Sequence, residues 1–207
     1  MTKEPVVAIL GATGAVGQEF IRLIGERKFP YSKLKLLASY RSAGKKLTVN
    51  GQEYTVEEAK PESFDGVDIG LFAGGSISKE LGPEAAKRGC VVIDNSSTFR
   101  MDPDVPLVVP EVNPEDIAWH KGIIANPNCS TIITVTAVNA LNAISPIRSM
   151  VASTYQAVSG AGAGGPVELA EEVEALRTGK PVQPKVFSHQ IAYNLIPQIG
   201  GEQYEGY

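Results

Sequence analysis

The chain has 207 residues, of which 43% are hydrophobic and 20% are charged, an ordinary composition for a globular protein. Its formal net charge is −4 and it has no long basic run, which argues against nucleic acid or a membrane surface as a partner. No stretch approaches the ~18 apolar residues of a membrane span.

The N-terminal sequence and the number of cysteines favour a cytoplasmic protein. The first apolar run, Val6–Leu10, is short and is broken by Gly11, so no secretory signal is expected. Two cysteines, Cys90 and Cys129, do not form a disulfide framework, and the sequence shows no metal-ligand cluster. We therefore predict a reducing cytoplasmic environment and no metal site.

A glycine-rich turn follows the first predicted strand, Val6–Leu10, and leads into a helix predicted over residues 18–25. Strand, glycine turn and helix provide the setting of a dinucleotide fingerprint, in which the pyrophosphate rests on the helix N-terminus. The spacing is G-x-x-G-x-x-G rather than G-x-G-x-x-G, and a glycine turn alone is weak evidence. The predicted cofactor-binding residues of this turn are Gly11, Thr13, Gly14, Ala15, Val16 and Gly17.

The segment after the second predicted strand, residues 34–38, indicates which cofactor binds. An NAD-binding fold carries Asp or Glu there, which holds the ribose 2′-hydroxyl and would repel a 2′-phosphate. This chain instead has Arg41, flanked by the hydroxyls of Ser39 and Ser42, which would bind a 2′-phosphate. The sequence therefore favours NADP over NAD. The alternative is an ordinary basic surface loop over residues 41–46.

Two more strands are predicted at residues 67–73 and 91–94, each ending in small polar residues. Residues 77–88 between them have a helical pattern that Pro83 should break. Strands that alternate with helices indicate an α/β fold with a parallel, doubly wound sheet, which binds ligands at the carboxyl ends of its strands. Cys90 opens a buried strand and is interpreted as structural.

Arg100 follows a predicted strand end at that same edge of the sheet. An arginine there can clamp a phosphate or a carboxylate with two parallel hydrogen bonds. The alternative is a surface ion pair with Asp102 or Asp104. The pattern of residues by itself does not decide between the two.

The sequence Asn-Pro-Asn-Cys-Ser-Thr at residues 126–131 places Cys129 between an apolar strand and a mostly apolar stretch, residues 131–141, predicted to be a buried helix. A thiol on a first helical turn meets unpaired N–H groups and the positive end of the helix dipole. Both favour the thiolate, and so a nucleophile. The alternative is a buried structural cysteine, the more common fate of a free thiol.

The last part of the chain is predicted to contain a strand at residues 150–157, rich in Val, Thr and Tyr, and then a glycine-rich ordered turn that lets the backbone approach the cofactor. The alternative for this turn is a flexible linker. An acidic amphipathic helix is predicted over residues 167–177, with Glu168, Glu171, Glu172 and Glu174 on a solvated face. Residues 200–207 show no clear period.

Five segments in this order resemble aspartate-semialdehyde dehydrogenase. They are GATGAVG at residues 11–17, ASYRSAGK at 38–45, DNSSTFRMDPDVPLVVPEVN at 94–113, NPNCSTI at 126–132 and STYQAVSGAG at 153–162. The resemblance implies a Rossmann-type NADP-binding domain over residues 1–127, followed by the first part of an α+β catalytic and dimerisation domain over residues 128–207. It also implies a homo-oligomer.

The resemblance implies reductive dephosphorylation of L-4-aspartyl phosphate by NADPH to L-aspartate 4-semialdehyde and phosphate, a step toward lysine, threonine, methionine and diaminopimelate. Cys129 would form an acyl-thioester, and Gln156 would orient the substrate beside it. Asn128 and Arg100 would hold the substrate phosphate. The cofactor would also contact Ser159, Gly160 and Gly162.

The family's catalytic histidine has no match among the two histidines of this chain, His120 and His189. We therefore expect the chain to correspond to the N-terminal part of the enzyme and to have little or no activity alone. A non-catalytic NADP-binding fragment is one alternative. N-acetyl-γ-glutamyl-phosphate reductase is another, although its cysteine motif resembles N-P-G-C-Y, whereas Asn128 and Ser130 flank the thiol here.

Overall fold

The structure is a computed structural model that describes residues 4–197. The chain forms two compact units, Met1–Thr154 and Tyr155–Tyr207. The domain boundary inferred between residues 127 and 128 stays a prediction. Residues 198–207, which include the whole stretch with no clear period (200–207), lie outside the described residues.

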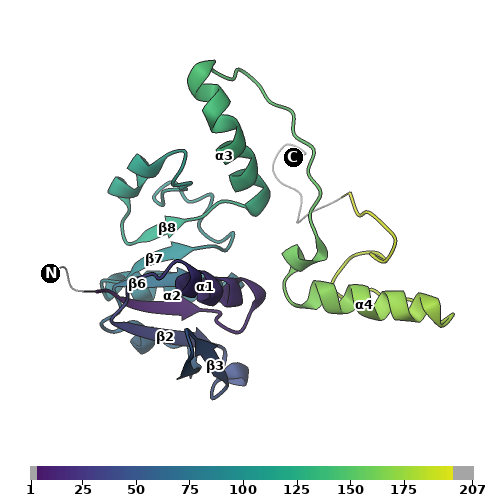
Figure 1. Cartoon of the computed structure of the whole chain (residues 1–207), viewed down its shortest axis with the longest axis horizontal. Coiled ribbons are helices and arrows are strands. Elements are labelled where there is room, and N and C mark those ends of the chain that lie inside the picture. The colour runs from purple at the N-terminus through teal and green to yellow at the C-terminus, as the bar shows by residue number, and fades with distance from the viewer. Residues whose placement is uncertain (1–3, 198–207) are drawn as a thin grey trace. The chain divides into compact units, whose positions relative to one another are not determined.

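A six-stranded parallel sheet forms the centre of the first unit, in the order β5-β2-β1-β6-β7-β8 (Figure 1). The chain builds outward from β1 to β2 and β5, then crosses over to β6, β7 and β8 on the other side. This reversal beside β1 is the switch point of a doubly wound fold, so the predicted fold class is confirmed. The strands are β1 (Val6–Leu10), β2 (Lys33–Ala38), β5 (Glu57–Glu58), β6 (Ile69–Phe72), β7 (Val91–Asp94) and β8 (Ile123–Ala125).

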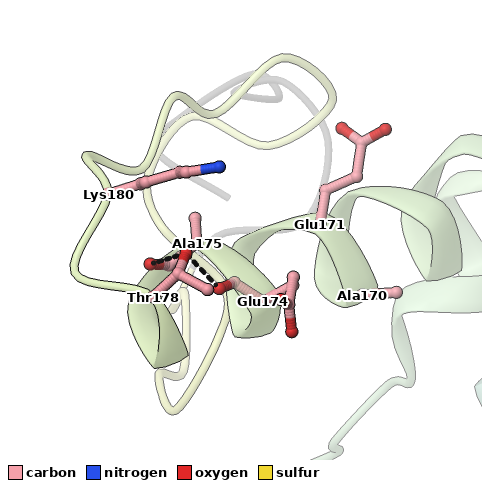
Figure 2. Close-up of a pocket in the computed structure, with 6 residues that line it drawn as sticks. All are labelled: Ala170, Glu171, Glu174, Ala175, Thr178 and Lys180. Carbon is pink, nitrogen blue, oxygen red and sulfur yellow. Dashed lines mark hydrogen bonds between the residues drawn. The ribbon is translucent and has the colours of Figure 1, made fainter.

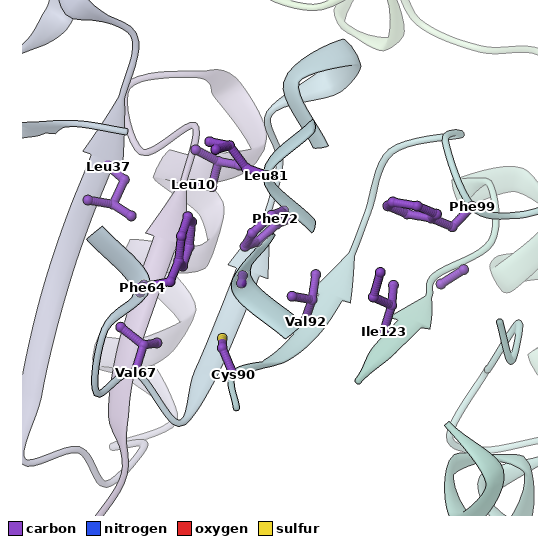
Figure 3. Packing of buried hydrophobic residues seen from close by; sticks show 13 residues of the cluster. Leu10, Leu37, Phe64, Val67, Phe72, Leu81, Cys90, Val92, Phe99 and Ile123 are labelled. Atoms are coloured by element: carbon purple, nitrogen blue, oxygen red, sulfur yellow. The ribbon is translucent and has the colours of Figure 1, made fainter. Parts of the chain in front are cut away.

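Alternate residues of each strand point to opposite faces of the sheet, and a helix covers each face, so both faces are buried. Val7 and Ile9 belong to one core cluster together with Ile21 and Ile24 of helix α1 (Ala15–Glu26). The opposite cluster contains Leu10 of β1 and Phe72 of β6, and Leu81 and Ala85 of helix α2 (Ser78–Lys87) (Figure 3). A small antiparallel hairpin, β3 (Lys46–Val49) with β4 (Gln52–Thr55), follows β2.

Helix α2 runs without interruption through Pro83, so the predicted break is wrong. A proline normally disfavours a helical residue before it, through a clash with that residue's Cβ. Here the preceding residue is Gly82, which has no Cβ, and a Cβ at this position would lie 3.0 Å from the Phe99 ring. Burial of Leu81 and Ala85 against the sheet offsets the lost hydrogen bond.

Helix α3 (Cys129–Ile144) forms where a helix was predicted, but none of its residues is buried. Ile133 is 70% exposed and Ile144 is 85% exposed. A helix that is apolar on most of its surface is typical of a buried element, and this pattern led to the prediction of a buried helix. Burial needs an opposing surface as well as an apolar sequence, and among the described residues no such surface covers α3.

The strand predicted at residues 150–157 is absent, because residues 146–157 have no regular secondary structure. Val151 is 98% exposed and Tyr155 is 83% exposed. A sequence rich in Val, Thr and Tyr fits a strand, but the strand forms only when a neighbour satisfies its backbone hydrogen bonds. None of the described strands pairs with this segment.

The second unit contains helix α4 (Gly164–Arg177), and two of its glutamates contradict the predicted solvated face. Glu168 and Glu172 are 4% and 3% exposed. Glu168 accepts hydrogen bonds from the backbone N–H groups of residues 185, 186 and 187, and Glu172 accepts from those of residues 191 and 192. The two carboxylates therefore attach the segment that follows the helix to its side.

Attachment by Glu168 should be sensitive to acid. Burial raises the pKa of the Glu168 carboxyl, but the backbone donors of Phe187, Val186 and Lys185 outweigh burial and bring the pKa below its usual 4.5. Because the folded-state pKa is the lower one, the carboxylate stabilises the attachment fully above pH 4.5. This contribution is lost as the pH falls through the folded-state pKa.

We therefore expect the amide NMR signals of Val186 and Phe187 to change in a transition centred below pH 4.5. Glu168→Gln should abolish the transition, because its amide has no group that takes up a proton in this pH range. Glu171→Gln is the matched control: Glu171 lies on the same helix but is exposed, and it pairs with the Lys185 side chain at 3.2 Å. A midpoint above 4.5 in the unmodified chain would contradict the assignment.

Candidate functional site

The glycine turn after β1 holds α1 unusually close to the strand. Gly11 has a φ of +84°, and a Cβ there would lie 2.6 Å from the carbonyl oxygen of Ala73. A Cβ on Gly17 would lie 2.1 Å from the carbonyl oxygen of Gly11, so only glycine fits. Gly14 is less constrained, with 3.3 Å to that same oxygen. The first and third glycines of the G-x-x-G-x-x-G spacing therefore have clear steric roles.

The turn leaves the first N–H groups of α1 available to an anion. The backbone N–H groups of Gly11 and Ala12 donate to the carbonyl of Leu37 at 2.8 and 3.1 Å, which fixes the turn against β2. Gly14 begins the helix without a side-chain cap, and the first turn of α1 carries no acidic residue. Orphan N–H donors and the positive end of the helix dipole therefore coincide, as a bound pyrophosphate requires.

The segment predicted to bind a 2′-phosphate lies against this turn. Thr13 Oγ1 donates to Ser42 Oγ across 3.3 Å, and thereby joins two groups of predicted cofactor residues that are far apart in sequence. Tyr40–Ser42 forms a single 3₁₀ turn, in which the Arg41 guanidinium carbon lies 5.9 Å from the centre of the Tyr40 ring. Arg41 is exposed, and so is Ser39 before it. Residues 39–42 thus form an accessible basic turn at the end of β2.

Asp94, at the end of β7, organises the next loop from a fully buried position. Its carboxylate accepts from the hydroxyl and the backbone N–H of Ser96, at 2.6 and 3.3 Å. Ser96 Oγ in turn accepts from the backbone N–H of Thr98 at 3.2 Å. The loop that leads to Arg100 is therefore fixed by side chains as well as by burial of Phe99.

Arg100 points back toward the ends of β7 and β8. Its Nε donates to the carbonyl of Asn126 at 2.9 Å and its Nη2 to the carbonyl of Asn95 at 3.1 Å. In the described part of the chain it forms no ion pair, and Asp104 pairs instead with Lys121. Neither alternative partner, Asp102 or Asp104, therefore holds this guanidinium.

Cys129 is exposed and is the first residue of α3. Asn128 is the N-cap, and its Oδ1 accepts from the Ser130 backbone N–H at 3.0 Å. The alternative of a buried structural cysteine is therefore wrong for Cys129. Asn126 and Cys129 are three residues apart, so their Cα atoms lie within about 11 Å of each other. Through its bond to Asn126, Arg100 is anchored beside the cysteine turn.

Cys90 has the opposite environment. It is 1% exposed and packs in the core under β6 and β7, as Figure 3 shows. Burial, and to a smaller extent the charge of Asp68, raises the pKa of the Cys90 thiol to about 12. Its interpretation as a structural cysteine agrees with this burial.

Gln156, Ser159, Gly160 and Gly162 belong to the second unit, and their roles stay predictions. Residues Val158–Ala161 form a 3₁₀ turn, and Gly162 follows with a φ of +83°. A Cβ on Gly165 would lie 2.0 Å from the carbonyl oxygen of Val158. The glycine-rich segment is therefore a tightly packed turn, in contrast to the flexible linker considered as its alternative.

Neither histidine has the setting of a general base. His120 Nδ1 accepts from the backbone N–H of Gly122 at 3.0 Å, a local contact that shapes the turn before β8. His189 is exposed, and its Nδ1 lies 3.0 Å from the neighbouring Ser188 hydroxyl. Among residues 4–197, no three His, Cys, Asp or Glu side chains gather as a metal site would require.

A hollow of about 440 Å³ lies on the surface of the second unit, along the last turns of α4 (Figure 2). Thr178 Oγ1 donates to the carbonyls of Glu174 and Ala175, and Lys180 extends over the hollow. None of the predicted site residues lines it. No helix in the described part of the chain has the length and hydropathy needed to cross a membrane.

Comparison with known proteins identifies the family of both parts of the chain. Residues 6–120 match the model of the semialdehyde dehydrogenase NAD-binding domain, and residues 138–207 match the semialdehyde dehydrogenase dimerisation domain. The first match alone spans more than half of the chain. The chain belongs to the semialdehyde dehydrogenase family.

Relatives of this semialdehyde dehydrogenase chain include aspartate-semialdehyde dehydrogenase of Bacillus subtilis, which is 51% identical over 97% of the chain. A crystal structure of aspartate semialdehyde dehydrogenase II from Vibrio cholerae, complexed with ASA, is 47% identical over 100% of the chain, with a TM-score of 0.94. The Candida albicans enzyme, solved with NADP, is 30% identical over 70% of the chain, with a TM-score of 0.59. The chain spans 60%, 62% and 48% of these proteins, respectively.

Selective reaction of Cys129 tests the contrast between the two thiols. A pKa of about 12, against an ordinary 9.0, lowers the Cys90 thiolate fraction about a thousandfold at neutral pH. Burial also shields Cys90 from the reagent. We therefore expect iodoacetamide to label Cys129 in the native chain while Cys90 stays unlabelled, as measured by mass spectrometry of peptides.

Two controls complete that experiment. Cys129→Ser should remove the fast reaction, and guanidinium chloride should make Cys90 reactive at an ordinary rate. Equal labelling of both thiols under native conditions would contradict the assignment.

Proposed function

We propose that this semialdehyde dehydrogenase chain carries the cofactor site and the nucleophile of an NADP-dependent aspartate-semialdehyde dehydrogenase. The proposed reaction converts L-4-aspartyl phosphate to L-aspartate 4-semialdehyde and phosphate. One observation carries the proposal: Arg100 is bonded to the Asn126 carbonyl, three residues before an exposed Cys129 on the first turn of α3.

The first half of the reaction needs a nucleophile and an anion clamp. The Cys129 thiolate would attack the acyl carbon, forming a C–S bond as the C–O bond to phosphate breaks. The Arg100 guanidinium and the Asn128 amide would hold the phosphate as it leaves with the bonding electron pair. Backbone N–H groups at the start of α3 would stabilise the oxyanion of the tetrahedral intermediate.

The second half needs a hydride donor placed beside the thioester. NADPH, when bound, supplies that hydride to the acyl carbon. The chain's part is to bind the pyrophosphate at the first turn of α1 and the 2′-phosphate at Ser39, Arg41 and Ser42. In this proposal Gln156 orients the substrate. Ser159, Gly160 and Gly162 contact the cofactor. Collapse of the second intermediate releases the aldehyde and restores the Cys129 thiolate.

The preference for NADP rests on the charge at the end of β2. This end carries exposed Arg41 and no carboxylate within residues 39–45. A related structure, that of the Candida albicans enzyme, was solved with NADP. The Thr13–Ser42 hydrogen bond would hold the 2′-phosphate turn beside the pyrophosphate turn.

Replacing Arg41 with alanine tests the 2′-phosphate site. A charged hydrogen bond is worth about 1.5–3 kcal/mol, so Arg41→Ala should weaken NADP binding about ten- to a hundredfold. NAD binding should change little, because NAD has no 2′-phosphate. Isothermal titration calorimetry with both cofactors gives the two affinities. Arg27→Ala, an exposed arginine at the end of α1, is the matched control. An unchanged preference after Arg41→Ala would disprove the assignment.

Assembly, location and pathway follow as further parts of the proposal. The match of residues 138–207 to a dimerisation domain supports a homo-oligomer, and we propose a dimer. Two free cysteines support a reducing, cytoplasmic location. The product would serve the synthesis of lysine, threonine, methionine and diaminopimelate.

We expect the 207-residue chain alone to show little or no turnover. Its two histidines make local contacts, and the chain spans about 60% of the Bacillus subtilis relative. The assay is phosphate-dependent reduction of NADP with aspartate semialdehyde, followed at 340 nm. A form extended to the length of the relatives should be active. Measured turnover by the 207-residue chain would overturn the first expectation.

Substrate choice in the extended form separates the proposal from its neighbour. Activity with N-acetyl-glutamyl phosphate instead of aspartyl phosphate would favour N-acetyl-γ-glutamyl-phosphate reductase. Activity with neither substrate, despite intact NADP binding, would favour a non-catalytic NADP-binding protein.

A further inference from the structure

A ring of three hydrogen bonds joins the loop that carries Arg100 to the turn that carries Cys129. The Asn126 side chain donates through Nδ2 to Asn95 Oδ1. The Asn126 carbonyl accepts from Arg100 Nε at 2.9 Å, and the Asn95 carbonyl accepts from Arg100 Nη2 at 3.1 Å. Each of the three residues therefore contacts the other two.

The ring depends on the register of the sheet. Asp94 and Ala125 are register partners at the ends of β7 and β8, so Asn95 and Asn126 are the first residues after each strand. The Asn126 N–H donates to the Asp94 carbonyl at 2.8 Å, and the Asn95 N–H donates to the Phe72 carbonyl at 2.9 Å. These bonds fix the N–H side of each asparagine, whereas the carbonyls that Arg100 contacts belong to the next peptide, where the Asn126–Asn95 side-chain bond links the two loops.

The ring also leaves part of the guanidinium for a ligand. Arginine has five N–H donors, and two of its nitrogens here, Nε and Nη2, contact backbone carbonyls. Nη1 has no hydrogen-bond partner among the described residues. Because the guanidinium is already oriented, a phosphate would bind without first ordering a mobile side chain.

We infer that Asn126 is a positioning residue that fixes Arg100 relative to the Cys129 thiol. The inference rests on the proposed function, because it gives Arg100 the role of binding the substrate phosphate. It adds that the side chains of Asn126 and Asn95 hold the phosphate-binding Arg100 at a fixed position relative to the nucleophile, Cys129.

Alkylation of Cys129 with a charged and a neutral reagent tests the inference in the chain as it exists. Iodoacetate is an anion and iodoacetamide is neutral, so the ratio of their rates reports positive charge near the thiol. The ratio does not depend on the thiolate fraction or the exposure of Cys129, which affect both reagents equally. Cys90 stays unlabelled in a folded chain and reports any unfolding in the same samples.

In the unmodified chain at low ionic strength, the ratio should exceed that of Arg100→Ala by about two- to fivefold, and salt should reduce the difference. Asn126→Ala should lose most of this excess, although Arg100 itself is present. Asn95→Ala should act similarly, and the double variant should be no worse than either single variant. Asn139→Ala is the matched control, because the Asn139 side chain also donates a hydrogen bond to a residue far away in sequence, in this case to the backbone carbonyl of Glu111 at 3.1 Å.

The outcomes separate the two proposals. If Asn126→Ala keeps the full ratio while Arg100→Ala loses it, the positioning role is wrong and the phosphate clamp stands. If the unmodified chain and Arg100→Ala give the same ratio, Arg100 does not act near the thiol, and the clamp in the proposed function is wrong as well. In an active extended form, Asn126→Ala should raise KM for phosphate more than it lowers kcat.

Discussion

The parallel register of the sheet is the constraint on which the candidate site depends. Six strands run in one direction, so their carboxyl ends meet at one edge. The glycine turn follows β1, the basic turn follows β2, the Arg100 loop follows β7 and the cysteine turn follows β8. Residues up to 115 positions apart, from Asn126 to Gly11, are brought to this edge by the pairing of the strands. A slip in register between β7 and β8 would separate Asn95 from Asn126.

Side chains then refine what the sheet places. Asp94 is buried and shapes the 95–100 loop through Ser96, while Asn126 links this loop to the cysteine turn. On the cofactor side, Thr13 links the glycine turn to Ser42. Each link joins two turns that come from different strands. Polar contacts at a half-exposed edge cost little desolvation free energy, and they reduce the motion of groups that must act together.

The sequence predicted the elements whose local pattern and packing agree. Strands β1 and β7 were predicted with their observed bounds, because short apolar runs before glycine or small polar residues are typical of parallel strands. The predictions were wrong where a distant partner decides. Residues 150–157 have the composition of a strand, but no described strand pairs with them. Helix α3 has the composition of a buried helix, but none of its residues is buried. Helix α2 continues through Pro83 because the preceding residue, Gly82, has no Cβ for the proline ring to clash with.

The same distinction holds for side chains in the site. Cys129 and Arg100 were identified from their types and from their places after predicted strands. The Asn126–Asn95 pair was missed, because no local pattern shows that two asparagines 31 residues apart will meet. A signal was present in the sequence: each asparagine directly follows a predicted strand, and adjacent parallel strands bring their following residues together.

Glu168 and Glu172 show the converse, since helical spacing suggested a solvated face but five backbone N–H groups of a later segment bind them. A polar side chain beside a strand end or an irregular segment is therefore better judged by the backbone donors and acceptors it can satisfy than by its charge.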